Sequence, residues 1–429
     1  MKNKYINIVE KLLFFIPFVI FVLYTSVPFV FAIRSNSKII SFIIKIFNYM
    51  FMKGPYVFIF ICIVLLIYIF LKGEKKQKII TVITIMGTLF MCLNLINIEI
   101  NFLTTLLFVS SYLIGIFYSI SLFIYFKNKK VIDIKDKIIK ALKFIVNYIF
   151  IIFILSIISN TSQYSYYNAD QGLTGWFKST NGLGHALVFL LPLFILFYIK
   201  NKKNKYLYYI IVISFLDLLI GTKACYYGLI STLLVSIIYL SIDYFKYKKY
   251  HYFKLVSLII IFLMTLLISK NIYISEHIKN SLKTNTNEKN QVDIINFTIS
   301  NRDENLYIIK PYFNESNVTT KVFGLGIYYP RFDFIYIELD LYDLLYNRGI
   351  YGFLLYLGFF GYIIINLFIK LYKNFKKLNI DVLFMFLTLG YIMFAAIFVG
   401  HVLFNLMALT LAILVMNYYY FIINKKIKK

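Results

Sequence analysis

The chain has 429 residues, of which 61% are hydrophobic, and its formal net charge is +26. In a soluble protein this excess of basic residues would suggest nucleic-acid binding. Here apolar runs of about 17–25 residues recur along the chain, and each is long enough to cross a bilayer. Because backbone polar groups inside a membrane must be satisfied within the segment, these runs should be α-helices. The composition therefore predicts an all-α polytopic membrane protein that binds no nucleic acid.

About twelve apolar runs are predicted to span the membrane. In chain order they cover approximately residues 12–33, 56–71, 79–97, 102–126, 138–158, 182–199, 206–221, 223–242, 254–270, 349–370, 380–400 and 402–423. The first run is too long for a signal peptide and lacks a small-residue cleavage site, so we interpret it as a retained helix. The three cysteines, Cys62, Cys92 and Cys225, offer neither a disulfide framework nor a metal-binding spacing.

Basic residues crowd every second connection between these runs, as the positive-inside rule requires. The basic segments are KGEKKQK (72–78), KNKK (127–130), KNKKNK (200–205), KYKKYHYFK (246–254), KLYKNFKK (370–377) and the tail KKIKK (425–429). We therefore predict a multi-pass protein of the cell membrane whose two termini are cytoplasmic.

The longest connection on the opposite, outer side is polar and covers residues 271–348. It divides the chain into residues 1–270 with the first nine spans, the extracytoplasmic loop, and residues 349–429 with the last three. Within the loop, helical spacing of apolar residues predicts a helix from Val292 to about Phe313. Long connections in compact proteins are usually functional or disordered.

Missing motifs exclude several classes of enzyme. The chain has no Walker A sequence, no GxGxxG in its usual context, and no HExxH or CxxC motif. The predicted cytoplasmic connections are too short to hold a nucleotide-dependent domain. Any chemistry is therefore expected inside the membrane or on its outer face.

Charged residues on the predicted outer face form a mixed set of cations and carboxylates. The set comprises Lys223, Arg302, Arg331, Glu338, Asp340, Asp343, Arg348 and His401. Any one of them could be a solvated loop charge. Lysine and arginine are, however, normally enriched on the cytoplasmic side, so cations on the outer face are unusual. Arginine and lysine suit phosphate groups, and fixed cations would stabilise the charge on a departing pyrophosphate. A lipid-linked sugar pyrophosphate is one phosphate compound that lies at the outer surface of a membrane.

The acidic members of the set have two possible roles. A carboxylate or histidine near an acceptor hydroxyl could act as a general base. Asp340 and Asp343 are three residues apart, so on a helix they share a face, and Glu338 stands near the helix entrance. Acidic residues also stabilise a helix N-terminus, here of an outer helix leading into the span at 349–370. Both roles stay open for these carboxylates.

Five short stretches occur in a characteristic order. They are STNGLGHALVFLLPLF (179–194), LIGTKACYYGLI (219–230), NRDENLYIIKPYFNESNVTTKVFGLG (301–326), ELDLYDLLYNRGIYG (338–352) and GHVLFN (400–405). Together they resemble motifs of the O-antigen ligase and O-antigen polymerase superfamily, particularly its Gram-positive members. The resemblance covers roughly residues 160–405.

The resemblance implies roles for individual residues. The family's pyrophosphate-contacting basic residues fall on Lys223 and Arg302, and the loop histidine of the ligases falls on Glu338. Because that histidine is missing, we expect Glu338 to replace it as the base. Asp340, Asp343 and Arg302 complete the expected catalytic set, and Arg331, Arg348 and His401 complete the expected substrate-binding set.

The resemblance also implies an activity, that of an inverting, GT-C-like glycosyltransferase. It would polymerise undecaprenyl-pyrophosphate-linked repeat units into a capsular or O-antigen-like surface polysaccharide, with no cofactor and no metal. Expected partners are the lipid-linked oligosaccharide, membrane lipid, a chain-length regulator and a flippase. The alternatives are a ligase that transfers finished polymer to another acceptor, and a flippase for the same unit. A flippase should show internal repeats; none is visible in the sequence, which favours the enzyme.

Overall fold

The computed structural model describes residues 2–26, 45–46, 48–49, 54–96, 102–127, 129–166, 171–201, 204–247, 252–271, 302–326, 337, 339–374 and 380–427. Its helices are α1 (Lys2–Leu12), α2 (Ile16–Leu23), α5 (Gly54–Lys72), α6 (Lys75–Ile96), α7 (Phe102–Lys127), α8 (Val131–Ile158), α9 (Thr180–Lys200), α10 (Lys205–Ile220), α11 (Lys223–Tyr247), α12 (Tyr252–Asn271), α15 (Arg302–Glu315), α16 (Val318–Phe323), α17 (Asp340–Asn374), α18 (Ile380–Phe394), the π-helix η3 (Ala395–Val399) and α19 (Leu406–Ile427). Two short strands, β1 (Gln163–Tyr166) and β2 (Gln171–Gly175), form an antiparallel hairpin.

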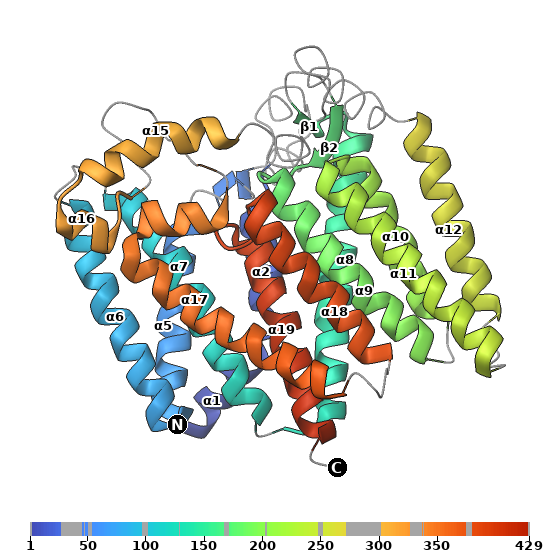
Figure 1. Ribbon diagram of the computed structural model, residues 1–429, viewed down its shortest axis with the longest axis horizontal. Coiled ribbons are helices and arrows are strands. Elements are labelled where there is room, and N and C mark those ends of the chain that lie inside the picture. Colours follow the sequence, from blue (N-terminus) through green and yellow to red (C-terminus); the bar gives the residue numbers. More distant parts are fainter. Residues whose placement is uncertain are drawn as a thin grey trace.

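The long helices lie side by side in one bundle (Figure 1). Helix α15 lies across one end of this bundle, beside α16, and the hairpin β1–β2 lies at the same end. Both chain termini lie at the opposite end. We call these the loop end and the terminal end. Helix α9 is at the centre of the bundle: its residues from Gly182 to Ile199 are all buried, and it packs against α10, α11, α18 and α19.

The apolar runs of the sequence form helices, as predicted. Among the described residues, seven helices are long and apolar enough to cross a membrane, or eight if a bent pair counts as one span. Shorter apolar helices cover Tyr56–Lys72, Tyr252–Ile268 and Leu406–Ile422. An α-helical, multi-pass membrane protein is thus confirmed, while the number of twelve spans stays a prediction.

The first predicted span differs from the structure. Its described helix is α2, which begins at Ile16 instead of residue 12 and meets the preceding α1 at a bend of 59°; residues 27–33 of the prediction lie outside the described residues. Pro17 occupies the first turn of α2, where its missing amide hydrogen costs no intrahelical bond. A proline inside the apolar run therefore starts a new helix there.

The predicted loop at 271–348 contains α15, which overlaps the predicted loop helix; residues 292–301 of that prediction lie outside the described residues. Helix α15 packs on the start of α17 through a small apolar cluster of its own. This cluster is formed by Ile309, Phe313, Ile337, Leu339 and Tyr346. The packing places α15 over the first turns of α17, like a cover. The hairpin β1–β2 was not predicted, because its two strands are short and polar.

Candidate active site

A buried carboxylate joins α17 to the segment that precedes α19. Asp340 is 1% exposed, and its Oδ2 accepts hydrogen bonds from the backbone amides of Val402 (2.9 Å) and Leu403 (2.8 Å). Charged acceptors form the stronger hydrogen bonds, which offsets part of the cost of burying the carboxylate. Just before these donors, His401 is half-buried and has a φ of 63°, an uncommon conformation outside glycine. Asp340 thus holds the loop on which His401 lies.

Asp343, the second predicted carboxylate of α17, is also buried. Its Oδ1 accepts hydrogen bonds from the backbone amide of Ile337 (3.0 Å) and from the side-chain amide of Asn347 (3.2 Å). Asp340 and Asp343 lie in the first turn of α17, as expected for residues three apart. They hold different parts of the chain: Asp340 the loop before α19, and Asp343 the chain that enters α17.

Two glycine segments contact each other through their backbones. Helix α17 is kinked at Gly349, which has a φ of 68° and a ψ of −179°. A Cβ atom there would lie 2.3 Å from the carbonyl oxygen of Val322, and a Cβ at Gly324 would lie 2.3 Å from that of Asn347. The Gly326 amide donates a hydrogen bond to the same Asn347 oxygen (3.0 Å). The GLG segment at 324–326 is therefore locked onto the kink.

Arg348, immediately before the kink, points into the bundle. Its side chain is 1% exposed, and its guanidinium carbon lies 4.6 Å from the ring centre of Tyr112 and 4.8 Å from that of Phe404. Its Nη2 donates a hydrogen bond to Ser111 Oγ (3.3 Å). Stacking between aromatic faces suits the planar guanidinium and would not suit a lysine. Arg348 thus connects α17 to α7 and to the segment before α19.

The 179–194 stretch meets the GHVLFN stretch through Asn405. Ser179 caps α9 by accepting a hydrogen bond from the Gly182 amide (3.3 Å), and Asn405 Nδ2 donates to the same hydroxyl (2.6 Å). A Cβ at Gly182 would lie 2.1 Å from Asn405 Cγ. Two residues later, a Cβ at Gly184 would lie 2.3 Å from the sulfur of Cys225. Small residues on α9 thus allow both neighbouring stretches to approach it closely.

Lys223 is the first residue of α11 and is half-buried. It follows Gly221, which ends α10 in the left-handed conformation with a φ of 68°. The turn between the two helices lies where the sequence predicted it. Together with the contacts above, four of the five characteristic stretches are joined at the loop end through α9 and α17. The remaining stretch, 301–326, carries α15 and packs on α17.

Three predicted site residues are not placed by these contacts. Glu338 and Arg331 lie outside the described residues. The backbone of Arg302 begins α15, but its side chain is likewise outside what the structure describes. The roles predicted for these residues remain predictions.

The structure adds candidate site residues that the sequence did not indicate. Besides Tyr112 and Phe404, Asn94 of α6 donates a hydrogen bond from Nδ2 to the Gly324 carbonyl (2.7 Å), so that it anchors the GLG segment. Asn94 is 5% exposed within an otherwise apolar helix. A polar residue inside a membrane span usually has a functional or structural partner. An asparagine in this apolar run was therefore the one sequence signal for the contact.

The fold and the site define a class: an α-helical, polytopic membrane protein with buried charged residues and a covering helix at one end of its bundle. Among the described residues, no group of three or more His, Cys, Asp or Glu side chains could hold a metal ion.

The chain belongs to the family described as O-antigen ligase like membrane protein, whose model matches residues 10–281 and 269–428. This family suggests a membrane enzyme of polysaccharide assembly, of broadly glycosyltransferase type, that acts on lipid-linked substrates. No curated protein and no solved structure matches the chain.

Proposed function

We propose that this protein is a membrane glycosyltransferase that polymerises undecaprenyl-pyrophosphate-linked oligosaccharide units into a surface polysaccharide. The observation that carries the proposal is the meeting of the family-like stretches at the loop end, around the buried Arg348 and beneath α15. Membership of the family supports the same class of reaction. In this proposal the loop end faces outward and both termini are cytoplasmic.

The proposed reaction needs positive charge beside the pyrophosphate and a base beside the acceptor sugar. Lys223, Arg302 and Arg348 supply the charge, which stabilises the leaving pyrophosphate. Glu338 takes the proton of the acceptor hydroxyl while that oxygen attacks the anomeric carbon and the pyrophosphate leaves with its electron pair. Arg331 and His401 contact sugar or phosphate. No metal or cofactor takes part.

The buried carboxylates have a positioning role in this proposal. Asp340 and Asp343 already accept two hydrogen bonds each from neighbouring amides. Those contacts fix the loop of His401 and the chain just before Glu338. We therefore assign the base to Glu338 and the shaping of the site to the two aspartates.

A gel of lipid-linked and surface glycans from cells lacking the protein tests the proposal. The expected result is a single lipid-linked repeat unit that accumulates, can be labelled from the outer face, and has no ladder above it. A full ladder retained on lipid would instead identify a ligase. A unit trapped on the cytoplasmic face would identify a flippase and overturn the enzyme proposal.

A further inference from the structure

A second feature of the bundle opens toward its terminal end. A cavity of about 570 Å³ opens between α6, α7, α17 and α19. Its wall residues Leu354 and Tyr362 are 61% and 64% exposed, so the cavity reaches the membrane-facing surface as a groove. On α17 its lining runs from Leu354 to Ile363, which is about 14 Å of helix. That length is about half the hydrocarbon thickness of a bilayer, the depth of one leaflet.

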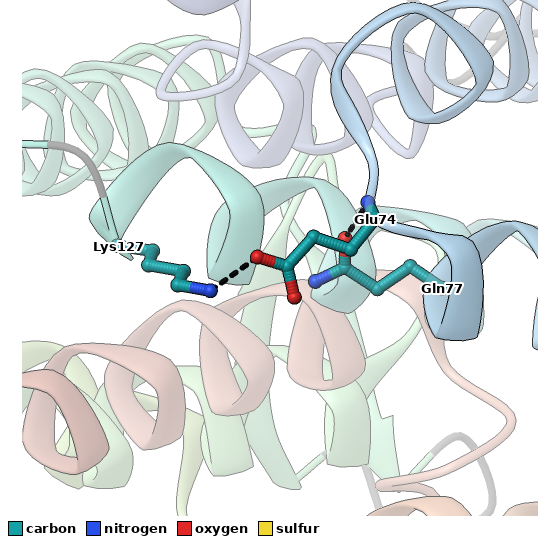
Figure 2. A network of polar contacts seen from close by, with 3 residues as sticks. All are labelled: Glu74, Gln77 and Lys127. Atoms are coloured by element: carbon teal, nitrogen blue, oxygen red, sulfur yellow. Dashed lines mark hydrogen bonds and ion pairs between the residues drawn. The ribbon is translucent and has the colours of Figure 1, made fainter.

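The rim of this groove is charged and lies at the terminal end. Glu74, Lys76 and Gln77 line it at the start of α6. Figure 2 shows that Lys127 donates a hydrogen bond to the carboxylate of Glu74. The backbone amide of Glu74 donates a second hydrogen bond, to Gln77 Oε1 (2.7 Å). The negative charge of Glu74 is therefore paired. Lys76 is exposed and makes no ion pair with any residue that the structure describes.

The interior of the groove combines a polar floor with an unfilled gap. On the floor, Asn417 Nδ2 donates a hydrogen bond to Ser119 Oγ (3.0 Å), and both side chains are buried. On the wall, a Cβ atom at Gly358 would meet nothing within 4 Å. The missing side chain leaves room for a narrow apolar chain against α17.

We propose that this groove binds one anionic phospholipid from the leaflet on the terminal side. One acyl chain lies along α17 past Gly358, and the head-group phosphate lies beside Lys76. Basic pockets between membrane helices are typical binding sites for anionic head groups. The substrate in the proposed function carries its pyrophosphate at the loop end, so the phospholipid is a different ligand and its site does not depend on that function.

Native mass spectrometry of the full-length protein with phosphatidylglycerol and phosphatidylethanolamine of identical acyl chains tests this inference. Wild-type protein should retain one phosphatidylglycerol in preference to phosphatidylethanolamine. Lys76→Gln should lower this preference about fivefold, the effect of one lysine near an anionic head group. Lys140→Gln on α8, also exposed, is the matched control and should keep the preference.

Filling the groove provides the second arm of the test. Gly358→Leu should reduce retained phosphatidylglycerol about tenfold, because the new side chain occupies the place of the acyl chain. Gly361→Leu is the matched control: a Cβ there also meets nothing within 4 Å, but Gly361 does not line the groove. Equal retention by both glycine variants, equal binding of the two phospholipids, or retention of a polyprenyl phosphate instead would overturn the proposal.

Discussion

Two sets of charged residues, one at each end of the bundle, are held in opposite ways. At the loop end, Arg348 and Asp340 are each 1% exposed and are held by aromatic rings, a hydroxyl and backbone amides. At the terminal end, the side chains of Lys127 and Glu74 pair while 53% and 61% exposed. An exposed ion pair contributes at most about 1 kcal/mol. Losing one partner of a buried charge costs about 3–5 kcal/mol.

This difference separates two uses of charge in one membrane protein. Exposed cations at the terminal end fit the positive-inside pattern, which depends on how many there are and not on their contacts. Buried charges at the loop end depend on their contacts. Substitutions at the loop end should therefore reduce stability or activity far more than substitutions of similar size elsewhere. Four pairs of variants test this expectation, beginning with the largest effect.

The largest effect is expected at the kink. Gly349→Ala would place a Cβ 2.3 Å from the Val322 carbonyl in a conformation that is essentially restricted to glycine. The variant should lose most of its folded protein in membranes. Size-exclusion chromatography in detergent and immunoblot measure this loss. Gly361→Ala, where a Cβ meets nothing within 4 Å, should keep the wild-type amount. Equal amounts of both variants would show that the kink is dispensable.

The next effect is expected at Arg348. Arg348→Ala should reduce polymer at least 100-fold per folded protein, the size of effect seen when a charge-stabilising donor is removed. Arg348→Lys keeps the charge but loses the planar stacking on Tyr112 and Phe404, and should still be strongly impaired. Glycan gels normalised to protein level measure both. Wild-type polymer from Arg348→Ala would remove this residue from the site.

Asp340 distinguishes positioning from chemistry. Asp340→Ala leaves the amides of Val402 and Leu403 without their acceptor, at about 1–3 kcal/mol each. Asp340→Asn retains an acceptor oxygen and should preserve both folded protein and most polymer. The melting temperature and the polymer yield should therefore both decrease in the alanine variant. A stable asparagine variant without polymer would instead assign Asp340 a chemical role.

The smallest effect is expected at Asn405. Asn405→Ala removes the bond to Ser179 and the cap of α19, in which Asn405 Oδ1 accepts from the Met407 amide (3.0 Å). Loss of a helix cap costs about 1 kcal/mol. We expect a modest decrease in the melting temperature, and Asn405→Asp, which can still cap, should recover part of it. An unchanged melting temperature in the alanine variant would show that the contact is not stabilising.

The sequence predicted the helices well, because apolar length decides where a membrane helix forms. Residues 102–126 and 254–270 were predicted as helical spans, and the structure has α7 at Phe102–Lys127 and α12 at Tyr252–Asn271. It did not predict the bend before Pro17, because α1 precedes the predicted span and its sequence KNKYINIVEKL is rich in polar and charged residues. A helix leading into the span at 349–370 was predicted, and the structure has it as the first part of α17; its place on the outer side stays a prediction.

The site was predicted only in part. Charged residues such as Arg348 stand out in an apolar chain, but their partners do not. Tyr112 and Phe404 are two among 39 tyrosines and 45 phenylalanines, so nothing local distinguishes them. The hydrogen bond from Arg348 to Ser111 joins residues 237 positions apart, which only the folded bundle brings together. Glu338, the predicted base, lies outside the described residues and must be tested by activity.

Reconstitution with the natural lipid-linked unit tests the central claim most directly. The unit would be extracted from cells lacking the protein and added to vesicles containing either wild-type protein or the Glu338→Gln variant, without nucleotide. We expect a ladder of lipid-linked polymer with wild-type protein, and unreacted single units with equally folded Glu338→Gln. Single units that stay unreacted with folded wild-type protein, or a ladder of equal yield with Glu338→Gln, would contradict it.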